Sequence, residues 1–181
     1  MNTFKYFYWN NVLNEKEINQ INSILDKNKE KLKDCPAPNT IKTSTVEYIK
    51  LKYLKNILQD ALYLLSENNR DHYGYNVYPF ADNSYVNINT YRKNQEYDWH
   101  CDMEYYKSSD LKLTGLINIS TSDFTGGELN LLDGTPQSEL KELNKPGAMV
   151  IFNSFLFHKV NPIKKGIRKT LTIWVKGPAF K

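Results

Sequence analysis

Short runs of strand-forming residues, separated by turns, fill the chain from about Tyr73 onward. In the clearest run, Tyr85–Tyr91, the side chains of Val86, Ile88 and Thr90 alternate with aromatic or polar ones, as in a strand with one buried face. Further expected strands are Leu113–Ile119, Glu128–Leu132, Ala148–Phe152, Phe155–Val160 and Thr170–Val175. The turn signals between them are Gly126-Gly127, Asp133-Gly134, Pro146-Gly147 and Lys165-Gly166. This spacing predicts a β-sandwich or barrel.

The N-terminal part is expected to be helical. Asn14 is a good N-cap and Glu17 completes a capping box, ahead of apolar residues at helical spacing. Cys35-Pro-Ala-Pro38 is predicted to end this helix, because proline cannot continue one. A second helix is expected from about Tyr48 to Leu65. Its apolar stripe is Leu51, Leu54, Leu58, Ala61, Leu62 and Leu65. Both apolar stripes are interpreted as core packing.

The composition indicates a globular protein, with 181 residues, 40% hydrophobic and 13% aromatic content. A net charge of +4 is too modest to predict nucleic-acid binding. The two cysteines, Cys35 and Cys101, form neither a disulfide framework nor a CxxC zinc pattern. The first residues, Met1–Trp9, lack the basic start and apolar run expected of a signal peptide, and no stretch approaches the length of a membrane span. We therefore expect a cytoplasmic protein without a membrane partner; the oligomeric state stays open.

A histidine and a carboxylate, His100 and Asp102, lie two residues apart. On a strand such residues share a face and can converge on one metal ion. A more distant histidine, His158, completes a two-His-one-carboxylate set, the arrangement of non-haem Fe(II) oxygenases. An isolated HxD motif occurs often by chance, but two of only three histidines fall in the required places. The third, His72, lies in a polar stretch and is interpreted as an exposed turn residue.

Several segments together resemble the 2-oxoglutarate/Fe(II) oxygenases of the prolyl 4-hydroxylase type, including the PKHD-type hydroxylases. They are Asn87–Tyr91, Tyr97–Asp102, Gly126–Leu129, Gly147–Phe152 and His158–Trp174. They occur in the family's order and at plausible spacing. The resemblance is clear from about Tyr73 to the C-terminus and looser before it.

The resemblance implies a mainly β fold with flanking helices, a double-stranded β-helix (jelly roll) with the N-terminal helices packed on one sheet. A single domain is expected over residues 1–181, with helical support over about 14–69 and the jelly-roll core over about 73–178. The implied cofactors are Fe(II), 2-oxoglutarate as co-substrate and O2, with ascorbate as an optional reductant. Succinate and CO2 would be the co-products.

The resemblance also implies roles for individual residues. Arg168, ten residues after His158, would pair with the distal carboxylate of 2-oxoglutarate, because a guanidinium is always charged and binds carboxylates bidentately. Thr170, on the same strand face, would add a hydroxyl donor. Tyr91 would lie near 2-oxoglutarate, and Asn118 or Thr114 would complete the co-substrate pocket.

Two aromatic residues are assigned to the substrate by the same resemblance. Tyr97, three residues before His100, and Trp174, six residues after Arg168, would form an aromatic wall for a proline ring. Thirteen tyrosines make chance matches easy, so packing in the core is a competing interpretation for Tyr91 and Tyr97. Core packing is also a competing interpretation for Trp174.

The expected activity is hydroxylation of proline in a peptide or protein substrate. Hydroxylation of a free amino acid or another small metabolite is the first alternative. A nucleic-acid demethylase of the same superfamily is disfavoured, because those enzymes resemble a pattern with a second arginine six residues after the first, where this chain has Trp174. A non-enzymatic jelly-roll binding module is disfavoured because all three metal ligands and Arg168 are present.

Overall fold

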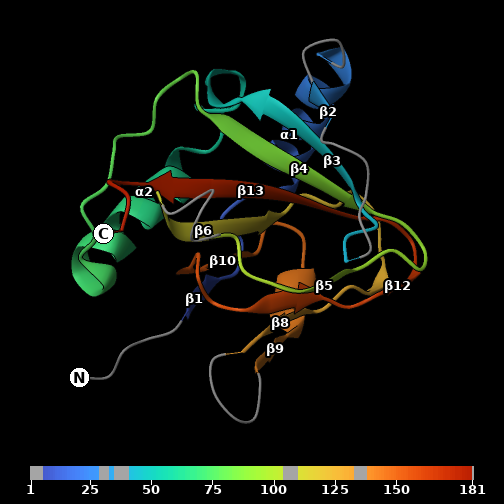
Figure 1. The fold of residues 1–181 in the computed structure, drawn as a ribbon. Helices are drawn as coiled ribbons and strands as arrows, with labels where there is room; N and C mark the ends of the chain where they lie inside the picture. Colours follow the sequence, from blue (N-terminus) through green and yellow to red (C-terminus); the bar gives the residue numbers. More distant parts are fainter. Residues whose placement is uncertain (1–5, 29–32, 35–40, 104–109, 133–137, 181) are drawn as a thin grey trace.

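The chain folds as two facing antiparallel sheets with helices on the outer face of the larger one (Figure 1). A computed structural model describes residues 6–28, 33–34, 41–103, 110–132 and 138–180. Its N-terminal elements are β1 (Tyr6–Trp9), α1 (Glu15–Lys27), β2 (Lys33–Asp34), β3 (Thr45–Lys50), a 3₁₀ turn (Leu51–Tyr53), α2 (Gln59–Asn68) and a π-helical turn (Asn69–Tyr73). Among the described residues, no helix is long and apolar enough to cross a membrane.

The remaining elements are strands, with one 3₁₀ turn among them. They are β4 (Tyr85–Tyr91), β5 (Tyr97–His100), β6 (Leu111–Asn118), β7 (Thr125–Gly126), β8 (Leu129–Leu131), β9 (Ser138–Leu140), a 3₁₀ turn (Lys141–Asn144), β10 (Met149–Asn153), β11 (His158–Val160), β12 (Ile163–Lys165) and β13 (Arg168–Lys176). The large sheet has the order β1-β10-β6-β13-β4-β3-β2, and the smaller one the order β5-β11-β8-β9. Strands β12 and β7 form a separate pair. The predicted jelly roll is confirmed.

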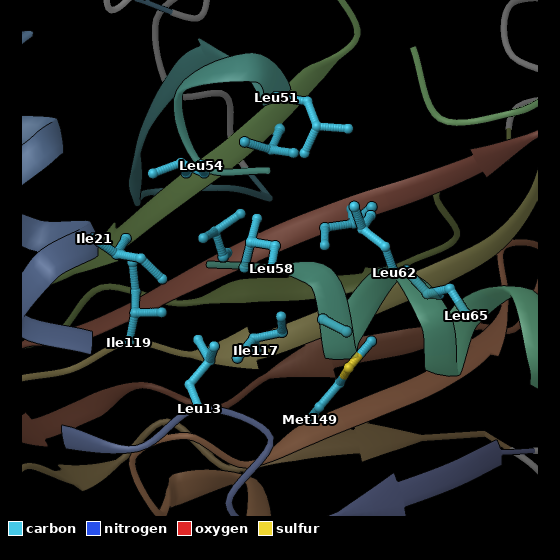
Figure 2. Packing of buried hydrophobic residues seen from close by; sticks show 14 of the residues in the cluster. Leu13, Ile21, Leu51, Leu54, Leu58, Leu62, Leu65, Ile117, Ile119 and Met149 are labelled. Atoms are coloured by element: carbon cyan, nitrogen blue, oxygen red, sulfur yellow. The ribbon is translucent and has the colours of Figure 1, made fainter. Parts of the chain in front are cut away.

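The large sheet buries both of its faces. On its outer face, residues of α1, α2 and the 3₁₀ turn pack on Ile88, Ile117 and Leu171 (Figure 2). On its inner face, Tyr91, Leu116 and residues of the smaller sheet form a second cluster. Because successive side chains of a strand point to opposite faces, the polar residues of β4 and β13 that alternate with the outer core face the smaller sheet.

Helix α1 begins as predicted and ends earlier than predicted. The side chain of Asn14 accepts a hydrogen bond from the Glu17 amide at 3.0 Å, and the Glu17 carboxylate accepts one from the Asn14 amide at 2.8 Å. The helix stops at Lys27, where the Asn28 side chain donates to the Ile24 carbonyl at 2.8 Å. The stop signal is therefore Asn28. The proline pair that was expected to end the helix lies outside the described residues, and Lys33–Asp34 is already a strand.

The prediction of a helix from Tyr48 was wrong over its first half. Residues Thr45–Lys50 form β3, which pairs with β4 in the register Val46↔Asn89 and Ile49↔Val86. Pairing with a neighbouring strand therefore overrides the helical spacing of the leucines. Helix α2 begins only at Gln59. The leucine stripe is nevertheless buried, as predicted, because the 3₁₀ turn and the turns after it direct the same side chains into the outer core.

The strand predictions were right in place and wrong at some ends. Tyr85–Tyr91 has the predicted bounds, and β6, β8, β10 and β13 differ from prediction by one or two residues at an end. Phe155–Phe157 was predicted as strand, but these residues form a turn, and β11 starts at His158. Phe155 and Phe157 are exposed, so their apolar character does not reflect the buried face of a strand.

Candidate active site

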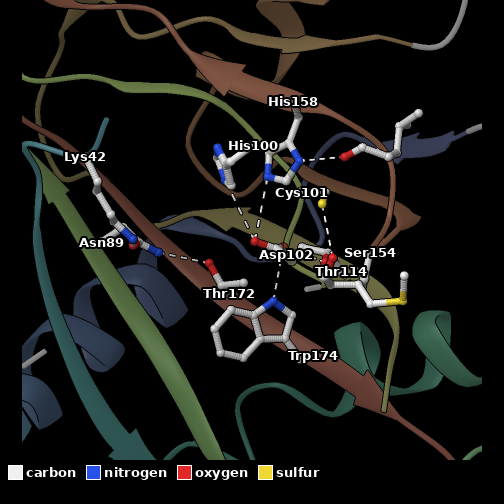
Figure 3. A network of polar contacts seen from close by, with 12 residues as sticks. Lys42, Asn89, His100, Cys101, Asp102, Thr114, Ser154, His158, Thr172 and Trp174 are labelled. Atoms are coloured by element: carbon white, nitrogen blue, oxygen red, sulfur yellow. Dashed lines mark hydrogen bonds and ion pairs between the residues drawn. The ribbon is translucent and has the colours of Figure 1, made fainter. Parts of the chain in front are cut away.

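The three predicted metal ligands meet between the sheets (Figure 3). His100 ends β5 and His158 begins β11, and these two residues are direct partners across the antiparallel pair. Asp102 lies two residues beyond β5 in a bend, so the argument from alternation along a strand was wrong for it. The bend nevertheless brings its Oδ1 to 3.8 Å from the Nε2 atoms of both histidines. One potential ligand atom from each residue lies within 4.8 Å of the others.

Both imidazole rings are held with Nε2 toward this point. The Nδ1–H of His100 donates to the Asp98 carbonyl at 2.7 Å, and that of His158 donates to the Leu156 carbonyl at 2.9 Å. A hydrogen bond at Nδ1 fixes the tautomer that leaves a lone pair on Nε2, as is usual for metal-binding histidines. Tyr97 stacks on His100 with ring centroids 3.4 Å apart.

Burial keeps the first histidine neutral. The loss of water around His100, together with repulsion from His158, lowers its pKa to about 3. Metal binding requires neutral imidazoles, and protons compete with a metal for the same lone pair. At neutral pH this histidine is therefore ready to bind a metal without first releasing a proton.

The carboxylate ligand is oriented by two donors from the large sheet. The Thr114 hydroxyl donates to Asp102 Oδ2 at 2.7 Å, and the Trp174 indole N–H donates to the same oxygen at 3.1 Å. Ser154 in turn lies 3.0 Å from the Thr114 hydroxyl. Because Oδ2 is held in this way, Oδ1 faces the histidines. Trp174, predicted as a substrate wall, thus contacts a metal ligand directly.

A buried cation lies on the inner face of the large sheet. Arg168 is 1% exposed, and its Nε and Nη2 atoms have no hydrogen-bond partner among the described residues. It pairs in register with Tyr91, whose ring centroid is 5.5 Å from the guanidinium carbon. Burial lowers the pKa of Arg168, opposed by Tyr91 and Glu128, but an arginine side chain stays protonated in proteins. A buried charge with free donors fits an anionic ligand, such as the distal carboxylate of 2-oxoglutarate.

The Gly126-Gly127 pair has a physical reason in the same region. Gly127 has a φ of +70°, and a Cβ there would lie 2.9 Å from Cδ of Arg168 and 2.4 Å from Cδ1 of Ile163. A side chain at this position would displace the arginine. Gly126, with a φ of +80°, passes close to the Pro162 carbonyl. The glycines let the β7 turn approach the Arg168 side chain closely.

Two other residues that were predicted to bind the co-substrate, Thr170 and Asn118, lie on the same sheet as Arg168. Thr170 is buried and pairs with Asn118 and Asn89 on the two neighbouring strands. The Asn118 amide donates to the Leu143 carbonyl at 3.0 Å, and its oxygen accepts from the Ser120 amide at 2.9 Å. Asn118 thus holds the backbone around it.

Sequence reasoning missed several polar residues that the fold adds to the site. Lys42 donates to Asn89 Oδ1 at 3.3 Å and lies 4.4 Å from the centroid of the Tyr97 ring, while Asn89 donates to the Thr172 hydroxyl at 2.9 Å. Ser154 reaches Thr114 only because β10 and β6 are adjacent. No local spacing marks Lys42 or Ser154. For Asn89 and Thr172, the available signal was the polar residues at every second position of β4 and β13.

Residues 86–176 match the family model of the 2OG-Fe(II) oxygenase superfamily, about half of the chain. The chain belongs to the 2OG-Fe(II) oxygenase superfamily. Fe(II), 2-oxoglutarate and O2 are the cofactor and co-substrates of this family, and the His100, Asp102 and His158 set and the unpaired Arg168 guanidinium fit the first two. The prediction of the family is confirmed.

A PKHD-type hydroxylase from Idiomarina loihiensis is 30% identical over 92 residues, which are 50% of this oxygenase and 41% of that relative. The chain therefore spans well under half the length of this relative. A prolyl 4-hydroxylase from Pseudomonas putida has a similar structure, with a TM-score of 0.76, 17% identity and coverage of 98% of this chain and 95% of that one. A prolyl hydroxylase from Trichoplax adhaerens, in complex with a hypoxia inducible factor peptide fragment, gives a TM-score of 0.73 at 18% identity, covering 97% and 84%. At these identities, the structures establish the fold alone.

Proposed function

We propose that this oxygenase hydroxylates a proline residue in a peptide or protein, using Fe(II), 2-oxoglutarate and O2. The observation that supports the oxidative chemistry is that two features lie together in the space between the sheets. One is a buried two-His-one-carboxylate set, and the other is a buried arginine with free donors on the facing sheet. The proline substrate is supported more weakly, by likeness to proteins named as PKHD-type or prolyl hydroxylases.

Each residue would have a defined task. His100, Asp102 and His158 would hold the iron through two Nε2 atoms and Oδ1, and would leave its other positions open. Iron bound with 2-oxoglutarate and O2 supplies the oxidising power that hydroxylates an unactivated C–H bond.

Arg168 would bind the distal carboxylate of 2-oxoglutarate, with Thr170 as a further donor and Tyr91 packed beside the guanidinium. The Thr114 hydroxyl and the Trp174 indole would keep Asp102 Oδ1 turned toward the metal. Tyr97 would fix the plane of His100 by stacking. Tyr97 and Trp174 would bind the substrate, as predicted, through the ring faces that these contacts leave available.

The direct test is incubation with Fe(II), 2-oxoglutarate, ascorbate and a panel of proline-containing peptides. We expect succinate release together with a peptide mass gain of one oxygen atom, and neither product from His158→Ala. If peptides gain no oxygen while a free amino acid does, the substrate is a small metabolite and only the oxygenase chemistry stands. If no succinate forms with any substrate class, the proposed activity is wrong.

A further inference from the structure

A cavity of about 590 Å³ lies on the inner face of the large sheet, beside Trp174. Its wall is largely aromatic, and the lining residues are Tyr48, Tyr78, Pro79, Phe80, Ala81, Ser84, Tyr85, Asn87, Trp174 and Lys176. This volume is within the range of about 300–1,000 Å³ that is usual for ligand pockets. Trp174 belongs to both places, because its indole N–H donates to Asp102 while its ring lines the cavity. A group held in the cavity therefore lies next to the metal site.

The cavity contains one buried polar atom with no partner. Asn87 is 3% exposed, and its side-chain oxygen accepts no hydrogen bond from the described residues. It lies on the same face of β4 as Asn89 and Tyr91, paired in register with Thr172. A buried acceptor without a donor destabilises the protein relative to one that is satisfied. A ligand that brings a donor into an otherwise apolar space would remove that cost.

Charge excludes several kinds of occupant. Of the lining residues only Lys176 is charged, and it is paired with Asp110 at 2.9 Å. The cavity thus offers no free cation for a phosphate or a carboxylate and no anion for an ammonium group. Burying an unpaired ion is strongly unfavourable, which disfavours a nucleotide and a zwitterionic amino acid. An uncharged apolar group beside an N–H donor meets all of these conditions, and an internal residue of a peptide has this chemistry.

We propose that this cavity is a specificity pocket that binds a large apolar side chain of a peptide substrate, with a backbone N–H of that peptide donating to Asn87 Oδ1. This inference rests on the proposed function for its substrate and names a recognition element separate from the reacting residue. Proline has no N–H, so the residue whose amide reaches Asn87 is not proline. The cavity thus selects a second residue of the substrate, displaced along the peptide from the one that is hydroxylated.

The binding step can be tested without turnover. The probe is N-acetyl-phenylalanine N-methylamide, added to the full chain loaded with Zn(II) as a diamagnetic replacement for iron. The indole N–H resonance of Trp174, assigned with Trp174→Phe, reports binding in a ¹H–¹⁵N spectrum. We expect a saturable shift of this resonance. The corresponding capped lysine and aspartate amides, and free phenylalanine, should bind at least about tenfold more weakly, because each brings a charge into the cavity.

Matched variants locate the binding. Ala81→Trp fills the cavity from an exposed position and should abolish the shift, whereas Ala179→Trp, also at an exposed position but outside the cavity lining, should not. Asn87→Leu keeps the approximate shape and removes the acceptor, so it should weaken binding about threefold to tenfold. The probe has two amide N–H groups, and each can be methylated separately. With the native chain, methylation of the N–H that donates to Asn87 should weaken binding by the same factor. With Asn87→Leu, that methylation should weaken binding no further.

The outcomes separate this inference from the proposed function. Equal binding of charged and apolar probes, or a full shift in Ala81→Trp, would overturn the pocket assignment. Strictly additive effects of Asn87→Leu and both N-methylations would overturn the amide contact. If peptides release succinate but those with apolar residues are not preferred, the proposed activity holds and the pocket assignment is wrong. If apolar probes bind selectively but no succinate forms with any substrate, the pocket assignment holds and the proposed activity is wrong.

Discussion

Replacing Arg168 with methionine should have opposite effects on the free protein and on its complex with 2-oxoglutarate. The guanidinium is fully buried, and two of its nitrogens have no partner. Without an anion it is an uncompensated charge, and replacing buried ionic groups by apolar residues of similar volume is often neutral or stabilising. Arg168→Met should therefore leave the melting temperature of the ligand-free protein unchanged or raise it. A residue important only for folding would lower it.

In the complex with 2-oxoglutarate, the same substitution should reduce affinity and stability. Removing one partner of a buried charge pair costs about 2–5 kcal/mol, which corresponds to about a 30-fold to 5,000-fold weaker affinity for 2-oxoglutarate. A ligand at 100 times its Kd stabilises the folded state by about 2.7 kcal/mol. For a chain of this size, each kcal/mol corresponds to about 2–4 °C, so the native protein should gain about 5–10 °C. At the same concentration Arg168→Met should gain less than about 1 kcal/mol, or no more than about 2–4 °C.

The assay is thermal unfolding with Mn(II) in place of Fe(II), with and without 2-oxoglutarate, so that no turnover occurs. The matched control is Lys169→Met, because Lys169 is the next residue along β13 and points to the other face, where it contacts Asn22 at 2.9 Å. The control should keep the full ligand-dependent shift. If Arg168→Met also keeps it, the co-substrate carboxylate binds elsewhere and the reasoning from unpaired donors is wrong.

Three further predictions concern the metal ligands and the helix. Thr114→Val removes the 2.7 Å hydrogen bond to Asp102 and should weaken Zn(II) binding about tenfold in a calorimetric titration; an unchanged affinity would mean that Trp174 alone orients the carboxylate. Asn14→Ala removes the capping box and should destabilise the fold by about 0.5–2 kcal/mol in urea without changing metal affinity. The metal-free protein should lose stability as pH falls below about 6.5, because unfolding lets His100 take up a proton that its lowered pKa refuses in the folded state; a flat profile from neutral pH down to about pH 4 would contradict this.

The metal site could be predicted from the sequence because its ligands are placed by local rules. His100 and His158 end and begin short strands that pair with each other, and Asp102 follows within two residues. The strand alternation used to derive the cluster failed at Asp102, yet the short spacing alone limits how far its carboxylate can lie from His100. Arg168 lies on the inner face of the large sheet, but the lack of partners for two of its nitrogens among the described residues depends on tertiary packing and has no signature in the sequence.

Other features depend on pairings between distant segments. The sequence from Tyr48 was predicted to start an amphipathic helix because the leucines after it recur at helical spacing, but pairing with β4 makes Thr45–Lys50 a strand. The hydrogen bonds of Thr114 with Ser154 and with Asp102 join residues 40 and 12 positions apart. The strand order of the large sheet brings Ser154 to Thr114, whereas the packing of the smaller sheet against it brings Asp102 there. Sequence periodicity predicts which face is buried far better than which partner a side chain meets.

Strands β4 and β13 place two unsatisfied polar groups on one inner face. Arg168, paired with Tyr91, has free donors at one end, and Asn87, paired with Thr172, has a free acceptor four residues away along β4. Four residues of strand span about 13 Å. Between them, Asn89 and Thr172 are bonded to each other, so the ladder is satisfied except at its ends. Free donors suit the anionic co-substrate and a free acceptor suits a neutral amide. The two ends of the ladder therefore suit different ligands, as proposed above: 2-oxoglutarate at Arg168 and a peptide amide at Asn87.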